Sequence, residues 1–225
     1  LRVLPDGDRW QEPTVVSFGQ LLTDVHRTAN LLHHLGVDRH STVALIAPNC
    51  AELVTATLAA QLAGVAAPIN AALSLDHITE LLRRSGARVL ITAGPELDPA
   101  TWATARQLAT ARVVDTVLLL APTGETVSSP EPLGVDGLTI GPLHALAMDF
   151  DGTEFTGIPP SGTDLAAVFH TGGTTGAPKL AAHTHTNEVT DAWMIAANTA
   201  LDEDSVVFAA LPLFHVNALV VTLLA

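Results

Sequence analysis

The chain has 225 residues, of which 48% are hydrophobic, and its formal net charge is −13. This length and apolar content are enough for a substantial buried core. The excess of acidic residues argues against a nucleic-acid-binding protein, and any anionic ligand must be held by local donors against the field of the whole molecule. The single cysteine, Cys50, excludes an internal disulfide framework, so we interpret it as a small buried hydrophobe in a reducing compartment.

Neither a membrane span nor a secretion signal is evident. No apolar run approaches the roughly 20 residues that cross a bilayer, and the start of the chain lacks a signal-peptide core. We therefore expect a cytoplasmic protein. The chain begins at Leu1 without methionine and ends on the apolar run 218–225, so we expect a piece of a longer protein. In this piece the apolar end should be exposed, frayed or buried in a self-association contact such as a homodimer.

The first half of the chain alternates between helices and strands. Ser17 and Gln20 predict a capping box for an amphipathic helix that ends at Gly36. Strand, helix and strand at this spacing predict parallel strands joined by crossover helices, which cover both faces of the sheet. The predicted fold class is therefore α/β, with a mostly parallel sheet. The later strands are expected at 43–47, 65–69, 88–92 and 113–120, and the later helices at 51–63, 75–85 and 99–109.

The second half divides into two regions. Residues 122–162 are rich in glycine, proline, serine and acidic residues, and we interpret them as a connecting or inserted segment with one short helix near 143–148. They separate an N-terminal α/β region, residues 1–121, from residues 163–225. In this last region we expect strands at 164–170, 180–184 and 206–210, and a helix at 187–200.

The loop after the first of these strands carries the strongest chemical signal. Glycine allows backbone N–H groups to turn toward an anion, threonine hydroxyls donate further hydrogen bonds, and lysine adds a positive charge. A flexible surface loop is the alternative, but it would not need a lysine behind a proline. A Walker A loop is excluded, because Leu180 stands where Ser or Thr would hold magnesium. The predicted phosphate-binding residues are Thr171, Gly172, Gly173, Thr174, Thr175, Gly176 and Lys179.

Histidines elsewhere in the chain give only weak signals for a metal. His183 and His185 would share one face of a strand, but no third ligand is spaced to complete a site. His33 and His34 lie at the end of a predicted helix, where they suit the negative pole of its dipole. We therefore predict no metal site formed by the protein.

The phosphate loop resembles the signature of the adenylate-forming superfamily, which includes acyl-CoA synthetases, non-ribosomal adenylation domains and luciferases. In that signature a (Ser/Thr/Gly)-Gly-Thr-Thr-Gly-x-Pro-Lys loop grips the β- and γ-phosphates of ATP. Leu180 departs from the glycine that usually follows the lysine. The resemblance extends to Thr184-His185 and to residues 36–37, 43–45, 48–49, 62–64, 68–70 and 85–90.

Residues 211–217 resemble a further motif of the superfamily, Pro-(Leu/Met)-Phe-His, which lines the acyl pocket. The resemblance therefore implies that Phe214, His215 and Asn217 belong to the substrate pocket, with His215 as a wall or gating residue. Residues 163–225 would then hold the phosphate loop and the start of this pocket. The alternative is the start of a helix with Phe214 in the core.

The resemblance implies a two-step ligase. A carboxylic acid, such as a fatty acid, attacks the α-phosphate of MgATP to give an acyl-adenylate, and a thiol, most often coenzyme A, then displaces AMP. The expected cofactors and substrates are thus ATP, Mg²⁺ and coenzyme A. Lys179 is the expected catalytic residue, because negative charge builds on the departing pyrophosphate.

The superfamily's later motifs, which contact adenine, bind the ribose through an aspartate and supply a second lysine on a C-terminal domain, have no counterpart before Ala225. We therefore expect this chain alone to be inactive. Besides the N-terminal part of an acyl-CoA synthetase, two alternatives remain. The first is a truncated, non-catalytic domain for nucleotide binding or assembly, and the second is an adenylate former that passes its acyl group to a carrier protein.

Overall fold

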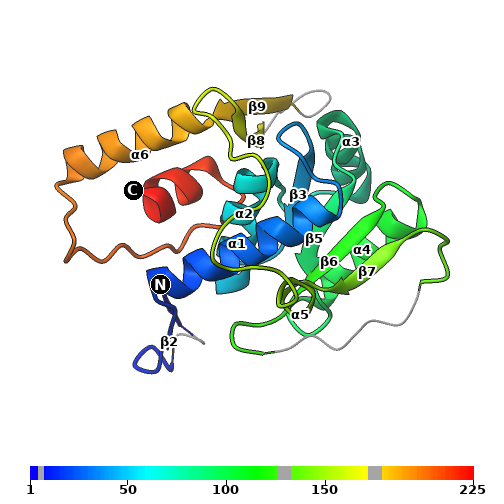
Figure 1. The fold of residues 1–225 in the computed structure, drawn as a ribbon. Helices are drawn as coiled ribbons and strands as arrows, with labels where there is room; N and C mark the ends of the chain where they lie inside the picture. The colour runs from blue at the N-terminus through cyan, green and yellow to red at the C-terminus, as the bar shows by residue number, and fades with distance from the viewer. Residues whose placement is uncertain (5–7, 126–132, 172–178) are drawn as a thin grey trace.

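The computed structural model describes residues 1–4, 8–125, 133–171 and 179–225, and its centre is a seven-stranded sheet (Figure 1). Every pair of neighbouring strands is parallel except the last pair, β8 and β9. This confirms the predicted α/β class with a mostly parallel sheet. In spatial order the strands are β7 (Thr139–Pro142), β6 (Thr116–Leu120), β5 (Val89–Ala93), β3 (Thr42–Ile46), β4 (Val65–Pro68), β8 (Leu165–Thr171) and β9 (Lys179–Thr184).

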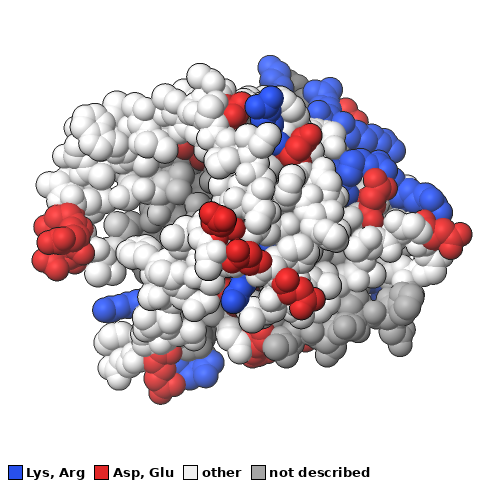
Figure 2. Space-filling model, viewed as in Figure 1, with Lys and Arg blue, Asp and Glu red and all other residues white. Residues whose placement is uncertain are grey.

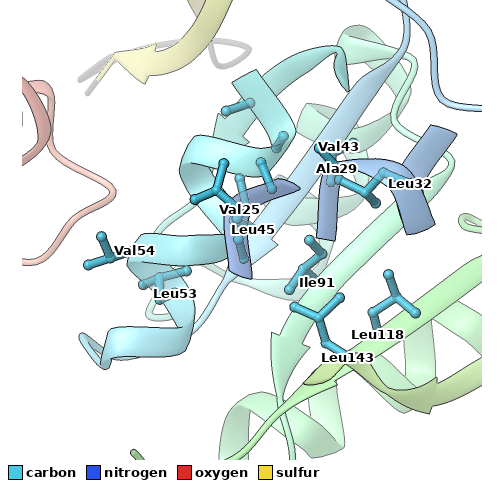
Figure 3. Close-up of a cluster of buried hydrophobic side chains, with 14 of the residues drawn as sticks. Val25, Ala29, Leu32, Val43, Leu45, Leu53, Val54, Ile91, Leu118 and Leu143 are labelled. Atoms are coloured by element: carbon cyan, nitrogen blue, oxygen red, sulfur yellow. The ribbon is translucent and has the colours of Figure 1, made fainter. Parts of the chain in front are cut away.

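Helices cover both faces of the sheet, as predicted. One face packs against α1 (Phe18–His34), α2 (Ala51–Ala63) and α5 (Leu143–Ala147), and the other against α3 (Leu75–Ser85) and α4 (Pro99–Thr110). Successive side chains of a strand point to opposite faces, so both faces of the sheet are apolar. In β3, Val43 and Leu45 enter the first core cluster, whereas Ala44 and Ile46 enter the second. Figure 3 shows the first cluster, in which side chains of α1 and α2 meet those of the sheet.

The ends of the helices are set by local hydrogen bonds. Ser17 Oγ accepts a hydrogen bond from the backbone N–H of Gln20, 3.1 Å away, but the Gln20 side chain turns to Asp24. Only half of the predicted capping box therefore forms. A complete one begins α6 (His185–Thr199), where Thr184 and Asn187 cap each other. The helix starts two residues earlier than predicted for this reason.

Cys50 lies in the first core cluster and is 6% exposed, as expected of a small buried hydrophobe. Burial raises the pKa of its thiol to about 12. Among the described residues, no helix is both long enough and apolar enough to cross a membrane.

The segment 122–162 contributes to the sheet as well as connecting its parts. The short helix expected near 143–148 is present as α5, and β7 adds a parallel strand beside β6 that the sequence did not predict. Strand β7 is only 4 residues long and contains Gly141 and Pro142, so it lacks the β-branched run that indicates a strand. The remaining small sheet pairs β1 (Arg2–Val3) with β2 (Thr14–Val15).

Two expectations for the last 20 residues are wrong. Residues 206–210 form no strand, and Val206 and Phe208 are 82% and 75% exposed. They lie in the connection that returns from the far end of α6 toward the sheet, and no strand pairs with them among the described residues (Figure 1). The apolar end is also neither exposed nor frayed, whereas its self-association stays a prediction. It forms the π-helix η1 (Asn217–Leu224), which packs beside α6, and Ala218 and Leu219 are fully buried in the first core cluster.

Candidate nucleotide and acid site

The two ends of the predicted phosphate loop lie side by side. Strands β8 and β9 form an antiparallel hairpin in which Thr171 and Lys179 are register partners, and both residues are exposed. The residues between them, including the predicted Gly172, Gly173, Thr174, Thr175 and Gly176, lie outside the described residues. Because β8 runs parallel to β4, the loop begins at the carboxyl edge of the parallel strands. Ligands of open α/β sheets bind at this edge.

One edge of the molecule is richer in cations than the acidic chain as a whole. Helix α3 packs beside β9, and Figure 2 shows Lys and Arg gathered along the edge where Figure 1 places α3 and α4. Some of this charge is paired, since Arg88 binds Asp115 and Arg84 binds Glu80. Arg88 precedes β5 and Arg112 precedes β6, so both lie at the amino edge of the sheet, opposite the edge at which the phosphate loop begins. Five of the ten Lys and Arg residues lie on α3 and α4 or within three residues after them: Arg83, Arg84, Arg88, Arg106 and Arg112.

The predicted acid-pocket motif is held by Asn49, to which the sequence analysis assigned no role of its own. The side-chain amide of Asn49 donates a hydrogen bond from Nδ2 to the carbonyl oxygen of Leu211, at 2.9 Å. Its Oδ1 accepts one from the backbone N–H of Leu213, also at 2.9 Å. Asn49 follows strand β3, so this two-point contact fixes the segment against the carboxyl edge of the sheet.

An aromatic cluster joins the acid-pocket motif to the start of the phosphate loop. The rings of Phe214 and His215 lie 4.2 Å apart between centroids, and Phe214 stacks on His170 at 5.9 Å and 21°. Phe214 is half-buried, whereas His215 and Asn217 are exposed. His170 directly precedes Thr171, and the sequence indicated only that it belongs to a buried strand. The structure thus brings two of the predicted site segments together through a residue that was not predicted.

The backbone around His170 fixes which ring nitrogen is free. Its Nε2 accepts a hydrogen bond from the backbone N–H of Asn70, 3.2 Å away in the turn after β4. An accepting Nε2 carries no proton, so the ring is neutral with its proton on Nδ1. Burial lowers the pKa of His170, and the nearby charge of His215 lowers it further. Both effects favour this neutral form.

A second polar cluster lies behind the hairpin, between α2 and α6. Glu188 is only 3% exposed, and its Oε2 accepts a hydrogen bond from Gln61 Nε2 at 2.7 Å. Its Oε1 lies 3.6 Å from His183 Nδ1 and, like His185 Nε2, has no hydrogen-bond partner among the described residues. Burial raises the pKa of Glu188 to about 7, against the opposing effect of the Gln61 hydrogen bond. Among the described residues, no group of three or more His, Cys, Asp or Glu side chains is placed to hold a metal ion.

We expect Glu188→Gln to stabilise the chain at pH 8 and to have a much smaller effect at pH 5. The unfolded carboxyl ionises near its ordinary pKa of 4.5 and the folded one near 7, so the wild type loses stability as the pH rises through this window. At pH 8 the gain should be about 1–3 kcal/mol. Urea unfolding at both pH values measures it. Glu203→Gln, on the exposed turn after α6, is the matched control and should change neither value. A destabilised Gln variant at pH 8 would show that the buried carboxylate is favourable.

A partly enclosed cavity lies away from these segments. It has a volume of about 280 Å³ between α1, α2, α5 and the end of β6, and its lining includes Arg27, Glu52 and Met148. None of the predicted site residues that the structure describes lines it. The hairpin and the 211–215 segment meet elsewhere, through the contact of His170 with Phe214.

Comparison with known proteins gives a consistent result. The family model described as "AMP-binding enzyme" matches residues 5–225. Marinolic acid–CoA ligase of Pseudoalteromonas sp. (strain SANK 73390) is 33% identical over 211 residues, which are 92% of this chain and 31% of that protein. Crotonobetaine/carnitine–CoA ligase of Escherichia coli O127:H6 (strain E2348/69 / EPEC) is 29% identical over 89% of this chain and 37% of that protein.

A solved structure, apo MatB from Rhodopseudomonas palustris, superposes with a TM-score of 0.76 at 24% identity. The match covers 98% of this chain and 39% of MatB. At this level of identity the likeness concerns the fold alone. The chain thus spans about a third of the length of the curated relatives that it matches.

Proposed function

The chain belongs to the family of AMP-binding enzymes, and from this premise we propose that its whole gene product is an ATP-dependent carboxylic acid:CoA ligase. By whole gene product we mean this chain with any residues that precede or follow it in its reading frame. The reaction would form an acyl-adenylate from the acid and ATP, and then a thioester with coenzyme A. The two relatives described above, which are named as CoA ligases of marinolic acid and of crotonobetaine or carnitine, support this acceptor over a carrier protein.

The observation that carries the proposal is the contact between the two predicted site segments. The Phe214 ring stacks on His170, the residue before the phosphate loop, and Asn49 holds the same segment at the carboxyl edge of the sheet. An acid lying along Phe214 and His215 would therefore sit beside the loop that holds the nucleotide. Adenylation requires this proximity, because the carboxylate must reach the α-phosphate in line with the departing pyrophosphate.

Lys179 would act at the end of the hairpin where the phosphate loop connects β8 to β9. Lys179 is exposed and pairs with Thr171 across the hairpin, so its ammonium group would reach phosphate oxygens held by the loop. It would neutralise the charge that develops on pyrophosphate, together with the magnesium ion that accompanies ATP. The acid itself supplies the nucleophile, so no covalent attack by the protein is needed.

The test is to incubate the whole gene product with MgATP, coenzyme A and a panel of carboxylic acids, and to identify the products by mass spectrometry. We expect AMP, pyrophosphate and one or more acyl-CoA thioesters. An acyl-adenylate that accumulates with coenzyme A but is discharged onto a carrier protein would favour the carrier-protein alternative. Formation of ADP would contradict adenylation altogether.

A non-catalytic role for residues 1–225 is the second candidate, and these residues match about a third of the length of the two relatives. We expect residues 1–225 alone to form no acyl-adenylate above background, even with MgATP and a good acid. Phosphate contacts without an adenine wall, a ribose-binding aspartate or a second lysine leave the α-phosphate poorly oriented. Pyrophosphate release by the purified chain measures this. Turnover near that of the whole gene product would show that the other residues are dispensable.

We expect His215→Ala to change which acids are accepted more than it changes ATP binding. His215 contacts Phe214 in the pocket segment and belongs to neither end of the phosphate loop. Loss of one contact in an apolar pocket should alter acid preference by about 10-fold or more. The comparison is the ATP KM against the ranking of acids, measured in parallel. A large ATP defect with an unchanged ranking would remove His215 from the acid pocket.

A further inference from the structure

We propose that His170 is a positioning residue for the acid, whose ring holds Phe214 in the pocket wall while its Nε2 is anchored to the backbone of Asn70. This inference rests on the proposed function and deepens it. It concerns a residue that precedes the phosphate loop and that neither the loop signature nor the pocket motif includes. Two contacts of this side chain, together with its place in the chain, bear on the role.

The first contact anchors the His170 ring. The backbone N–H of Asn70 donates to Nε2 at 3.2 Å, and the Asn70 side chain in turn accepts a hydrogen bond from the N–H of Ala72 at 2.9 Å. The turn after β4 is thereby closed on itself and tied to the end of β8. An imidazole held through one nitrogen has little freedom to rotate about its Cβ–Cγ bond. The ring is therefore a fixed surface at the edge of the sheet.

The second contact uses this surface. Phe214 lies over the His170 ring at 21° between planes, and its other neighbour, His215, is exposed. A half-buried phenylalanine in an irregular segment would otherwise have several open rotamers. Stacking on a ring that is itself anchored selects one of them. His170 therefore sets the position of the Phe214 ring in the wall of the acid pocket.

The place of His170 in the chain also matters, since His170 directly precedes Thr171, the first residue of the phosphate loop. A residue with this connectivity could serve either the acid or the nucleotide. The ring faces Phe214 and the turn at Asn70, whereas Thr171 and Lys179 are paired across the hairpin through their backbone register. The contacts of the side chain thus favour the acid. The role of His170 should appear in the KM for acid rather than in the KM for ATP.

Three substitutions distinguish the contribution of the His170 ring from that of its hydrogen bond to Asn70. His170→Phe keeps a stacking ring but has no acceptor for the Asn70 N–H, His170→Gln keeps an acceptor but has no ring, and His170→Ala has neither. His34→Ala is the matched control, because His34 also contacts a phenylalanine, Phe150, but at the far end of α1. Each variant of the whole gene product is assayed for acid-dependent pyrophosphate release. The KM for acid, the KM for ATP, the kcat and the midpoint of thermal unfolding are measured together.

We expect His170→Ala and His170→Gln to raise the KM for acid about two- to tenfold, the range that corresponds to the loss of one aromatic pair. The KM for ATP should change less than twofold, and His170→Phe should recover most of the acid affinity. His34→Ala should leave all kinetic values unchanged. Recovery by Gln and not by Phe would overturn the role of the ring, as would equal increases in the two KM values or an unchanged Ala variant.

The wild-type measurement distinguishes this inference from its premise. A wild type that releases pyrophosphate only when acid is present supports the proposed function whatever the variants do. Normal wild-type activity with unaffected His170 variants would then overturn the positioning role alone. A wild type without acid-dependent activity would overturn both. The thermal midpoints identify any variant whose kinetics reflect unfolding, and the Phe variant, which keeps the ring volume, is the least exposed to that problem.

Discussion

In single-turnover adenylation by the whole gene product, we expect Lys179→Ala to be slower than the wild type by a factor of roughly ten to over a hundred. A charge-assisted hydrogen bond is worth about 1.5–3 kcal/mol, and its loss would fall on the transition state, where charge moves onto pyrophosphate. Lys179 is exposed at the first residue of β9, so the substitution removes no core contact and folding should be unaffected. The measurement is made at saturating ATP, which separates the chemical step from binding.

Arg106→Ala is the matched control for this experiment. Arg106 is an exposed cation on α4, within the same basic edge of the molecule but outside the hairpin. If the general field of this edge assisted the reaction, both variants would be slowed to a similar extent. A wild-type rate for Lys179→Ala at saturating ATP would show that this lysine does not contact pyrophosphate in the transition state.

Gly64→Ala should destabilise the chain by about 3 kcal/mol, the largest effect that we expect from a single methyl group in this fold. Gly64 stands between α2 and β4, where the chain passes close to the loop before β3. A Cβ atom there would lie 2.5 Å from the carbonyl oxygen of Ser41 and 2.8 Å from that of Asp38. Both are backbone atoms, and the N–H of Val65 already donates to the Ser41 oxygen at 2.9 Å. Neither can give way without opening the start of β4.

The comparison is with Gly19→Ala, in the first turn of α1. A Cβ atom at that position would meet nothing closer than Ser17 Oγ at 3.9 Å, and alanine favours a helix by up to about 1 kcal/mol over glycine. We therefore expect opposite signs for the two substitutions in urea unfolding. A Gly64→Ala variant as stable as the wild type would mean that the approach of α2 to the loop before β3 is looser than the structure shows.

The central part of the fold was predictable because its signals are local and agree with one another. Ser74 before an amphipathic run and Gly86 after it delimit α3, and β3 and β5 are short apolar runs between such helices. Strand β7 was missed because a strand of 4 residues with glycine and proline gains its place from the edge it joins. The amino-acid composition of β7 does not reveal this pairing with the edge of the sheet.

The candidate site was predictable only in part, and the reason is again physical. The phosphate loop and the pocket motif each carry their residues within a few consecutive positions, so both can be read from the sequence. The contacts that join the loop to the motif cannot be read from the sequence in this way. Asn49 lies 162 residues from Leu211, and the His170 ring gains its role only where Phe214 stacks on it. The prediction of a buried strand at 206–210 was wrong for a related reason. An apolar run predicts that a segment is buried, but it does not show which neighbouring element would cover it.

Exchange of labelled pyrophosphate into ATP by the whole gene product tests the central claim most directly, since it reports reversible adenylation without requiring the identity of the thiol acceptor. We predict exchange that depends on both Mg²⁺ and a carboxylic acid, and that falls in Lys179→Ala but not in Arg106→Ala. Exchange that is independent of acid, or acid-dependent release of inorganic phosphate with ADP as the nucleotide product, would contradict it.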